Sequence, residues 1–259
     1  MSQFVHLHLH TEYSLLDGMC KIEEVIPLAK KYKMNSLAIT DHGNMAGVVK
    51  FYKVALDNGI KPIIGCEMYI SSGKMSDKEK KEKNNYHITL LASDNDGYKN
   101  LMALSTFSYL DGFYYKPRID EEILLKYSKG LIGMSGCLQG KIPYFLAKGE
   151  FEKAESVANT YIDIFGKENF YLELMDNNLP EQKKVNSLLI QLAKKFGIKI
   201  VATNDCHYLR KEDVFAHEVL LCIQTKTHIE DTKRLRFMTD QFYFKTPEEM
   251  EESFKDIPE

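Results

Sequence analysis

The stretch FVHLHLHT, residues 4–11, is the part of this sequence from which its fold is most directly inferred. Hydrophobic and polar residues alternate along it and turn residues bound it, which predicts a β-strand. Side chains alternate across a strand, so we expect its three histidines on one face and Val5, Leu7 and Leu9 on the other, beneath helices. Three imidazoles in a row make a poor core face, so this strand is predicted to carry function.

Strand-like and helical segments alternate along the rest of the chain. Six further strands are predicted, at residues 36–41, 62–71, 86–93, 131–135, 170–175 and 199–205. Helical periodicity is found at residues 21–34, 45–56, 96–109, 151–165 and 180–196. Such βα alternation favours a parallel sheet, and seven units over some 200 residues favour a closed or nearly closed barrel. The expected fold class is therefore α/β, a distorted TIM-like (β/α)7 barrel.

The barrel is predicted to occupy residues 1–210, and residues 211–259 form a short α+β extension. In the extension we expect a helix at 214–224, a strand at 241–245 and a helix beginning at Pro247, with Thr246 as its N-cap. With 259 residues, 44% of them hydrophobic, the chain can bury one large core.

Composition and charge exclude several classes of protein. The formal net charge of −3 does not favour strong nucleic-acid binding by the chain alone. Five cysteines without a CxxC pair suggest neither a disulfide framework nor a zinc ribbon, and reduced thiols fit a cytoplasmic location. We expect no signal peptide, membrane span or P-loop, because the corresponding patterns are missing from the sequence.

Histidines and acids gather near the ends of the predicted strands. His8 and His10, two residues apart on one strand, are spaced to chelate one metal, whereas His6 is interpreted as a hydrogen-bonded core residue. Other candidates are Asp41, His42, Glu67, His87, Cys137, Asp205 and His207. Most follow the carboxyl ends of strands, where βα barrels place active sites, although His87 begins its strand.

This number of ligands exceeds what one metal requires, so two or three divalent ions are predicted, with Glu67 as a bridge. Multinuclear sites suit phosphoester hydrolysis, because they activate a water and clamp both oxygens of an in-line displacement. The lysine-rich run at residues 72–85 is interpreted as a solvated excursion, with a basic lip over a phosphate substrate as the alternative.

The motifs HLHTEYSLLDG, LAITDHGNMAG, FYKVALDNGIKPIIGCE, DGFYYKPRID and ATNDCHYL resemble those of the polymerase and histidinol phosphatase (PHP) family. Within this family, the sequence closely resembles the N-terminal PHP domains of bacterial DNA polymerase III alpha subunits, over its whole length. The resemblance implies nine metal positions: His8, His10, Asp17, His42, Glu67, His87, Cys137, Asp205 and His207. Among them, catalytic roles are implied for Asp17, His42, Asp205 and His207. A thiolate at Cys137 favours zinc, and the carboxylates leave manganese or iron open.

By the same resemblance, the ligands divide into three groups, of which the first two share Glu67. These are His8, His10, Glu67 and Asp205; then Glu67, His87 and Cys137; then Asp17, His42 and His207. Asp41 is expected to orient a ligand. Lys116 and Arg118 are expected either to contact a substrate phosphate or to lie in a solvated loop.

Three functions are compatible with these residues. The first is a 3′–5′ exonuclease that acts on the 3′ end of a primer or single strand of DNA, which the chain alone would bind weakly. The second is a metal-stabilised structural module that braces the rest of a polymerase subunit and binds a proofreading subunit. The third is a stand-alone histidinol-phosphate-type phosphatase, against which the DGFYYKPR segment and the tail after His207 argue.

Overall fold

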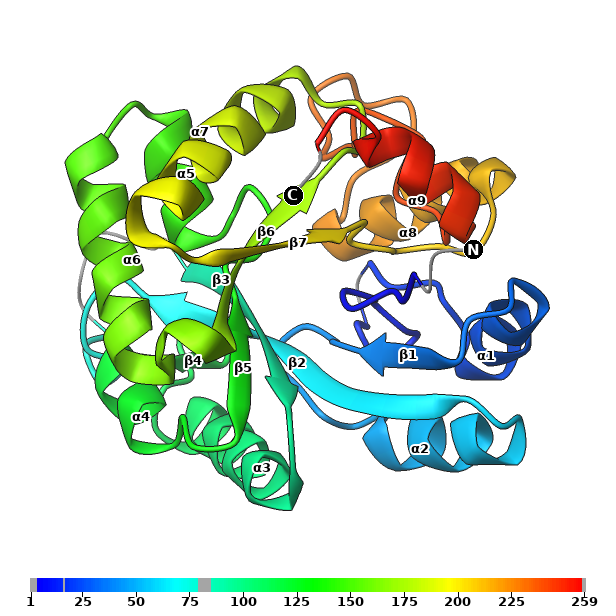
Figure 1. Cartoon of the computed structure of the whole chain (residues 1–259). Helices are drawn as coiled ribbons and strands as arrows, with labels where there is room; N and C mark the ends of the chain where they lie inside the picture. Colours follow the sequence, from blue (N-terminus) through cyan, green and yellow to red (C-terminus); the bar gives the residue numbers. More distant parts are fainter. Residues whose placement is uncertain (1–3, 16, 79–84, 258–259) are drawn as a thin grey trace.

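The computed structural model describes residues 4–15, 17–78 and 85–257, and its centre is a curled sheet with helices outside it (Figure 1). The sheet order is β1-β2-β3-β5-β6-β7, with β4 paired to β2. The strands are β1 (Ser36–Ile39), β2 (Lys61–Ser71), β3 (Asn85–Ala92), β4 (Arg118–Ile119), β5 (Leu131–Met134), β6 (Phe170–Met175) and β7 (Lys199–Thr203). The helices are α1 (Ile22–Lys31), α2 (Val48–Asp57), α3 (Asn95–Leu110), α4 (Glu121–Lys126), α5 (Lys141–Ala147), α6 (Phe151–Phe165), α7 (Pro180–Phe196), α8 (Val214–Thr225) and α9 (Pro247–Phe254).

The N-terminal segment, residues 4–11, bridges the two ends of the curled sheet. On one side, backbone N–H groups of Ala38 and Thr40 donate to the carbonyls of His6 and Leu9. On the other side, Cys206 N donates to the carbonyl of His8, and His10 N donates to that of Cys206. The segment therefore closes the barrel as predicted, but it forms isolated bridges instead of a regular strand.

The reason is one extra residue in this segment. Three residue steps, from His6 to Leu9, face only two steps, from Ala38 to Thr40, on the neighbouring strand. Strict alternation is therefore wrong here: Leu7 packs into the barrel interior, while His6 contacts Phe244 on the outside. A one-residue shift exchanges the two faces of a strand, which is how His6 leaves the face that carries His8.

The prediction of a purely parallel sheet is also wrong, because β3 runs antiparallel to both β2 and β5. The start of β3 consequently lies at the same rim as the carboxyl ends of the parallel strands. His87 stands near this start, paired with Tyr69 of β2. The reversed strand direction explains why a site residue begins its strand, whereas the others follow theirs.

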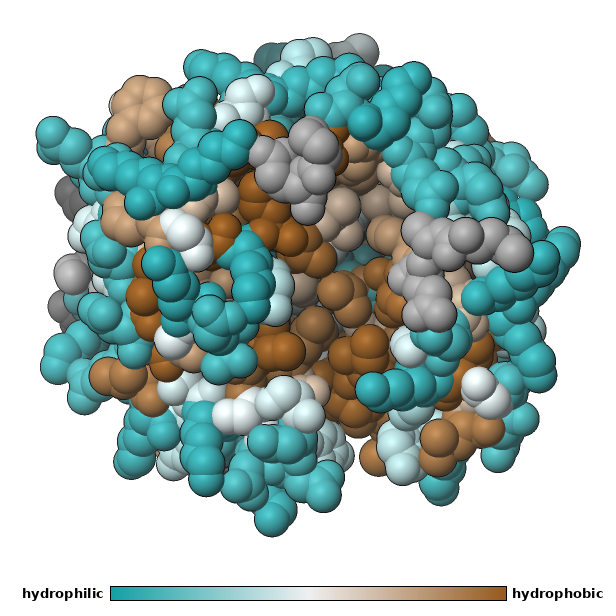
Figure 2. Space-filling view, viewed as in Figure 1, coloured by the Kyte–Doolittle hydropathy of each residue, from teal (hydrophilic) through white to brown (hydrophobic). Residues whose placement is uncertain are grey.

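The barrel interior is layered. The layer farther from the rim that carries the histidines is apolar. It takes one or two side chains from the N-terminal segment and from each strand of the sheet except β4: Leu7, Ala38, Ile63, Leu91, Ile132, Met134, Tyr171 and Val201. Two residues further toward the rim on the same faces stand polar groups such as Thr89, Glu173 and Thr203, all buried. Larger apolar clusters outside the sheet attach the helices. Hydrophobic residues surround the hollow centre of the face seen in Figure 2.

The extension packs back on the barrel. His207 N donates to the carbonyl of Phe242, and Phe244 N donates to that of Tyr208. The predicted strand at 241–245 is wrong, since only a single bridge between Tyr208 and Tyr243 forms. Helix α9 begins as predicted, with Thr246 accepting from Glu249 N and Pro247 in the first turn. The division at residue 210 stays a prediction.

Two other regions remain to be compared with the expectations: the segment between α3 and α6, and the lysine-rich run at residues 72–85. The segment between α3 and α6 contains β4, α4 and α5, none of which was predicted. Asp120 supplies the N-cap of α4 by accepting from Ile123 N. Residues 72–78 of the lysine-rich run form a loop after β2, and residues 79–84 lie outside the described residues. No helix among the described residues is long and apolar enough to cross a membrane.

Candidate metal centre

Glu67 stands at the centre of the predicted site. It is 1% exposed, and its carboxylate lies 2.6 Å from Nδ1 of His42, 2.9 Å from Nδ1 of His87 and 3.3 Å from Nε2 of His8. These three imidazoles come from the N-terminal segment, from the end of β1 and from the start of β3. Strands far apart in sequence thus deliver their histidines to one carboxylate.

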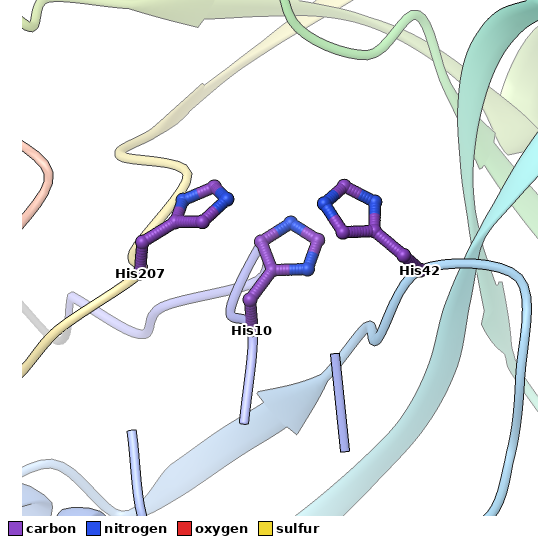
Figure 3. Close-up of side chains that lie close together, drawn as sticks. All are labelled: His10, His42 and His207. Atoms are coloured by element: carbon purple, nitrogen blue, oxygen red, sulfur yellow. The ribbon is translucent and has the colours of Figure 1, made fainter. Parts of the chain in front are cut away.

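His10 stands between His42 and His207 and links the two sides of the rim. Its ring centroid is 4.0 Å from that of His42 and 4.4 Å from that of His207. Figure 3 shows the three rings turned toward one another from the N-terminal segment, the chain after β1 and the chain after β7. A nitrogen from each lies within 4.8 Å of the others, close enough to share one cation.

The remaining predicted ligands complete this cluster. Asp17 Oδ2 lies 3.3 Å from His42 Nε2, and Asp205 Oδ1 lies 3.1 Å from His10 Nε2. The Cys137 sulfur is 3.8 Å from His87 Nδ1. Asp205 has a φ of +51°, an uncommon conformation for a residue other than glycine, which is tolerated by aspartate more readily than by most residues. The structure thus brings all nine predicted positions together at one rim.

Second contacts fix which ring nitrogen of His8 and of His207 faces the cluster. Nδ1 of His8 lies 2.7 Å from Glu173 Oε1, and Nδ1 of His207 lies 2.8 Å from the carbonyl of Asp205. Both oxygens can only accept, so both Nδ1 atoms carry the proton. In the neutral rings the Nε2 lone pairs are then available to a metal, which is the arrangement that ligating histidines usually show.

His10 is oriented through Ser14. The Ser14 hydroxyl donates to Asp41 Oδ1 at 2.7 Å, which uses its only proton. Its oxygen therefore accepts from Nδ1 of His10, at 3.0 Å, and from the backbone N of His42, at 3.1 Å. Asp41 also accepts from both donors of Thr11. The predicted orienting role of Asp41 is thus supported, acting on His10 through the hydroxyl of Ser14.

Several buried atoms of this cluster lie close to one another but form no hydrogen bond of suitable geometry among the described residues. They are Nε2 of His8 and of His10, Nδ1 of His42, and one carboxylate oxygen each of Asp17, Glu67 and Asp205. A buried polar atom without a partner is costly and rare in native proteins. Divalent cations would satisfy all of them, and the nitrogen and oxygen donors fit such ions. The residues present therefore fit a metal centre.

Within the cluster, neighbouring carboxylates and imidazoles strongly shift one another's pKa values. Burial alone lowers the pKa of His42, but the carboxylates of Asp17 and Glu67 outweigh it and raise that pKa to about 10. For His8, the carboxylates of Glu173 and Asp205 likewise outweigh burial and raise the pKa well above its usual value. Burial, followed by repulsion from His42 and His207, lowers the pKa of His10 to about 3. A bound cation would take the place of the protons on His8 and His42.

Glu173 is a site residue that the sequence reasoning missed. It lies on β6, is 1% exposed, and accepts hydrogen bonds from His8 Nδ1, Thr203 Oγ1 and Gly136 N. The signal that identified Glu67, an acid within an apolar strand, is also present here in FYLELM. Ser14 was missed as well, and its role depends on contacts that the sequence does not display.

Lys116 and Arg118, the predicted phosphate contacts, have different surroundings. Arg118 is 6% exposed and donates to the carbonyls of Gly112, Met75 and Asp77, so its guanidinium braces two loops. Lys116 lines a cavity that also borders His87, and its Nζ lies 5.2 Å from the ring centroid of Tyr69. Substrate contact stays a prediction for both, and the geometry favours Lys116.

Residues 6–177 match the family model of the PHP domain. Because this match covers more than half of the chain, the chain belongs to the PHP domain family. It is 46% identical over 258 residues to the DNA polymerase III subunit alpha of Treponema pallidum, covering 99% of this chain and 22% of that protein. With the same subunit of Thermus aquaticus it shares 49% identity over 253 residues, covering 96% and 21%.

The chain therefore spans about a fifth of the length of these curated relatives. Among solved structures, a protein from Bifidobacterium adolescentis described as a metal-dependent phosphoesterase aligns with a TM-score of 0.49 at 14% identity. That alignment covers 80% of this chain and 88% of the other.

Proposed function

We propose that this chain is the PHP domain of a bacterial DNA polymerase III alpha subunit and that it hydrolyses phosphodiester bonds at DNA 3′ ends. The observation that carries this proposal is the convergence of unpaired, buried nitrogen and oxygen atoms around Glu67. Two or three divalent ions held there would supply an activated water and a clamp for the oxygens of an in-line displacement. The likeness to alpha subunits supports DNA as the substrate.

The ligands differ in how far a substrate could reach them. The side chains of His42 and Asp17 are 14% and 16% exposed, whereas those of His8 and His10 are fully buried. A phosphodiester would therefore approach from the side of Asp17 and His42, while the side chains of Asp205 and His207 are 10% and 3% exposed. We assign these four residues the catalytic roles and Lys116 the contact with a substrate phosphate.

Zinc is the metal that the donor set fits best, with manganese or iron as alternatives. Burial raises the pKa of the Cys137 thiol well above its usual value, so the thiolate would form only against a cation. Thiolate and imidazole ligands together favour zinc, while Glu67, Asp17 and Asp205 are also suited to harder ions. Metal analysis of the purified chain, expected to give two or three equivalents, checks the number and identity.

The proposal is tested with the purified chain, stripped by a chelator and reloaded with zinc, manganese or iron. Single-stranded DNA and primers with a mismatched 3′ end are the substrates, and release of nucleotides is measured. We expect hydrolysis only in the metal-loaded protein and at least a hundredfold loss in Asp205→Asn. Asp57→Asn, at the exposed end of α2, is the matched control and keeps full activity.

The alternative is a structural module that braces the polymerase and binds a proofreading subunit. It predicts that metal-loaded protein leaves all primers intact, while Asp205→Asn lowers only the melting temperature. That result, from protein free of contaminating nuclease, would overturn the hydrolytic function and leave the metal centre in place. With a net charge of −3, weak DNA binding is expected, so substrate concentrations must extend well above the protein concentration.

A further inference from the structure

A cavity of about 320 Å³ lies beside the metal centre and shares His87 with it. Its other walls come from segments far apart in sequence: Tyr69 of β2, Lys116 before β4, Gln139 before α5, and Tyr144 within α5. Small-molecule pockets have volumes of roughly 300–1,000 Å³, so this one has room for a single small ligand and none for a duplex. A ligand in the cavity would be held directly beside His87.

The charge of the walls selects for an anion. No described residue lining the cavity is acidic, in contrast to the carboxylate-rich metal centre next to it. Lys116 contributes a cation to the lining. A second cation stands close by, since Nζ of Lys148 lies 4.2 Å from the ring centroid of Tyr144. An anionic group bordering His87 is therefore attracted from the cavity side as well as from the metal side.

The remaining walls suit a flat, polar ring. Tyr86 and Tyr144 meet with ring centroids 5.1 Å apart and planes at 69°, which gives the cavity an aromatic corner. Asn85 and Gln139 add amide groups, each of which offers both donors and acceptors to the edge of a ligand. The backbone carbonyl of Gln139 accepts from His87 N at 3.0 Å, which fixes this wall relative to the metal centre.

We propose that this cavity holds the terminal nucleotide of an unpaired nucleic-acid strand. The inference rests on the proposed function, which places a 3′-terminal phosphodiester at the metal centre. The base enters the corner formed by Tyr86 and Tyr144, with its edge at Asn85 and Gln139, and its phosphate lies between Lys116 and His87. A base that is paired and stacked within a duplex cannot enter, so frayed or mismatched 3′ ends are selected.

Tyr115 directly precedes Lys116, a lining residue of the cavity. It is 70% exposed, has a φ of +60° and stands at the apex of a turn closed by a hydrogen bond from Tyr114 N to the carbonyl of Lys116. A bulky residue held in the left-handed region is unusual and marks a candidate functional position. The ring contacts that of Tyr114 edge-on, with centroids 4.7 Å apart, and in this proposal its exposed part stacks on the next base of the strand, as aromatic residues do in proteins that bind single strands.

The test compares oligonucleotides that end in a normal or an abasic 3′ nucleotide. For the metal-loaded wild type, loss of the terminal base should lower kcat/KM about tenfold, as expected for one lost stacking contact. In Tyr144→Ala, and to a lesser degree in Gln139→Ala, the two substrates should become nearly equal. Tyr144→Phe, which retains the ring, should behave like the wild type, and Tyr52→Ala, at an exposed position of α2, is the matched control.

Binding of a nucleoside 5′-monophosphate, measured calorimetrically, gives a readout that does not depend on hydrolysis. We expect roughly tenfold weaker binding in both Tyr144→Ala and Lys116→Ala, and no change in Tyr52→Ala. If primers are hydrolysed but base removal has no effect, the nucleotide cavity is wrong and the hydrolytic function survives. If nucleotides bind with this residue dependence but no primer is cut, the hydrolytic function fails and the cavity survives. If Tyr144→Ala does not fold, the same measurements on Gln139→Ala and Lys116→Ala test the inference. It is overturned if neither variant changes the effect of base removal on kcat/KM or the affinity for the nucleoside 5′-monophosphate.

Discussion

At the scale of single residues, Glu173 shows how a buried carboxylate prepares a metal ligand. Its oxygens accept from His8 Nδ1, Thr203 Oγ1 and Gly136 N, so its position is fixed on several sides. It therefore holds the His8 ring in one orientation and directs Nε2 toward Glu67 and Asp205. Partners of this kind also raise the basicity of a ligating histidine.

We expect Glu173→Gln to weaken metal binding by about 10- to 100-fold, the range typical for such orienting partners. The amide has a single oxygen, so it can accept on the side of His8 and Thr203 or from Gly136 N but not on both sides, and it no longer attracts the His8 proton with a full negative charge. Metal titration followed by calorimetry measures the effect. Glu168→Gln, on an exposed ion pair with Lys199, is the control. An unchanged affinity in Glu173→Gln would show that Glu173 does not orient His8.

His6 predicts a dependence of stability on pH. Burial lowers the pKa of His6 from 6.5 to about 4 in the folded chain. The unfolded chain therefore binds more protons between these values, so stability is complete above pH 6.5 and is lost as the pH falls toward 4. From pH 7 to pH 5, His6 should account for about 2 kcal/mol of lost stability.

Urea denaturation at both pH values, in the presence of a chelator, checks this prediction. The loss of stability between pH 7 and pH 5 should be smaller in His6→Gln than in the wild type by that amount. The exposed His228 provides the control, since His228→Gln should leave the difference unchanged. Equal losses in His6→Gln and wild type would contradict the prediction.

At the scale of elements, the Thr40 side chain attaches the N-terminal segment to β1 at the point where backbone pairing is irregular. The extra residue between His6 and Leu9 leaves Leu9 N without a backbone partner among the described contacts. The hydroxyl of Thr40 accepts from Leu9 N at 2.8 Å and donates to the Leu9 carbonyl at 3.1 Å. One hydroxyl thus holds the segment that carries His8 and His10 against β1.

We expect Thr40→Val to lower the free energy of unfolding by about 1–3 kcal/mol, because the isosteric change leaves the buried Leu9 N–H unpaired. Urea denaturation of the metal-free chain gives the value. Thr40→Ser keeps the hydroxyl and should lose much less. If valine and serine variants are equally stable, the hydrogen bond does not hold the segment.

The reversed direction of β3 has a consequence for the site. A parallel strand in this place would present His87 at the opposite end of the barrel, away from Glu67. The two antiparallel pairings of β3 bring His87 Nδ1 to 2.9 Å from Glu67 instead. Strand direction, rather than an error in the strand boundary, accounts for the position of this residue.

At the scale of the whole molecule, metal ions bound at the candidate centre would tie the barrel together. The nine candidate ligands come from the N-terminal segment, the chain between it and α1, the ends of β1 and β7, β2, β3 and the loop after β5. An ion bound only by the folded chain stabilises it by about 2.7 kcal/mol at a concentration 100 times the dissociation constant. Metal removal is therefore expected to lower the melting temperature.

The same binding should weaken as the pH falls. Metal ions must displace protons from His8 and His42. Burial lowers the pKa of His42, but the carboxylates of Asp17 and Glu67 outweigh burial and raise it to about 10, and the pKa of His8 is raised well above its usual value. Affinity is expected to rise from pH 6 to pH 8, with proton release detected by calorimetry in buffers of different ionisation enthalpy. His42→Ala should release fewer protons, while His228→Ala should match the wild type. Binding without proton release would contradict this account.

Much of the fold follows from periodicity in the sequence. The bounds of α6 and α7 match their predictions, as does the N-cap of α9 at Thr246. Long amphipathic helices and capping residues are local signals, so they can be recognised without knowledge of the fold. The short elements β4, α4 and α5 were missed, because so few residues carry little periodicity.

The sequence by itself determined the chemical character of the site. Histidines two residues apart, acids in apolar strands and the PHP motifs identified nine positions, and the structure brings all nine to one rim. Which side chain faces which was decided only by the tertiary structure. The extra residue in the N-terminal segment turned His6 away, the reversal of β3 placed His87, and Glu173 and Ser14 gained their roles through contacts across the barrel. Residue identity fixes which atoms can bind a metal, whereas pairing register and strand direction depend on the whole chain and fix where those atoms point.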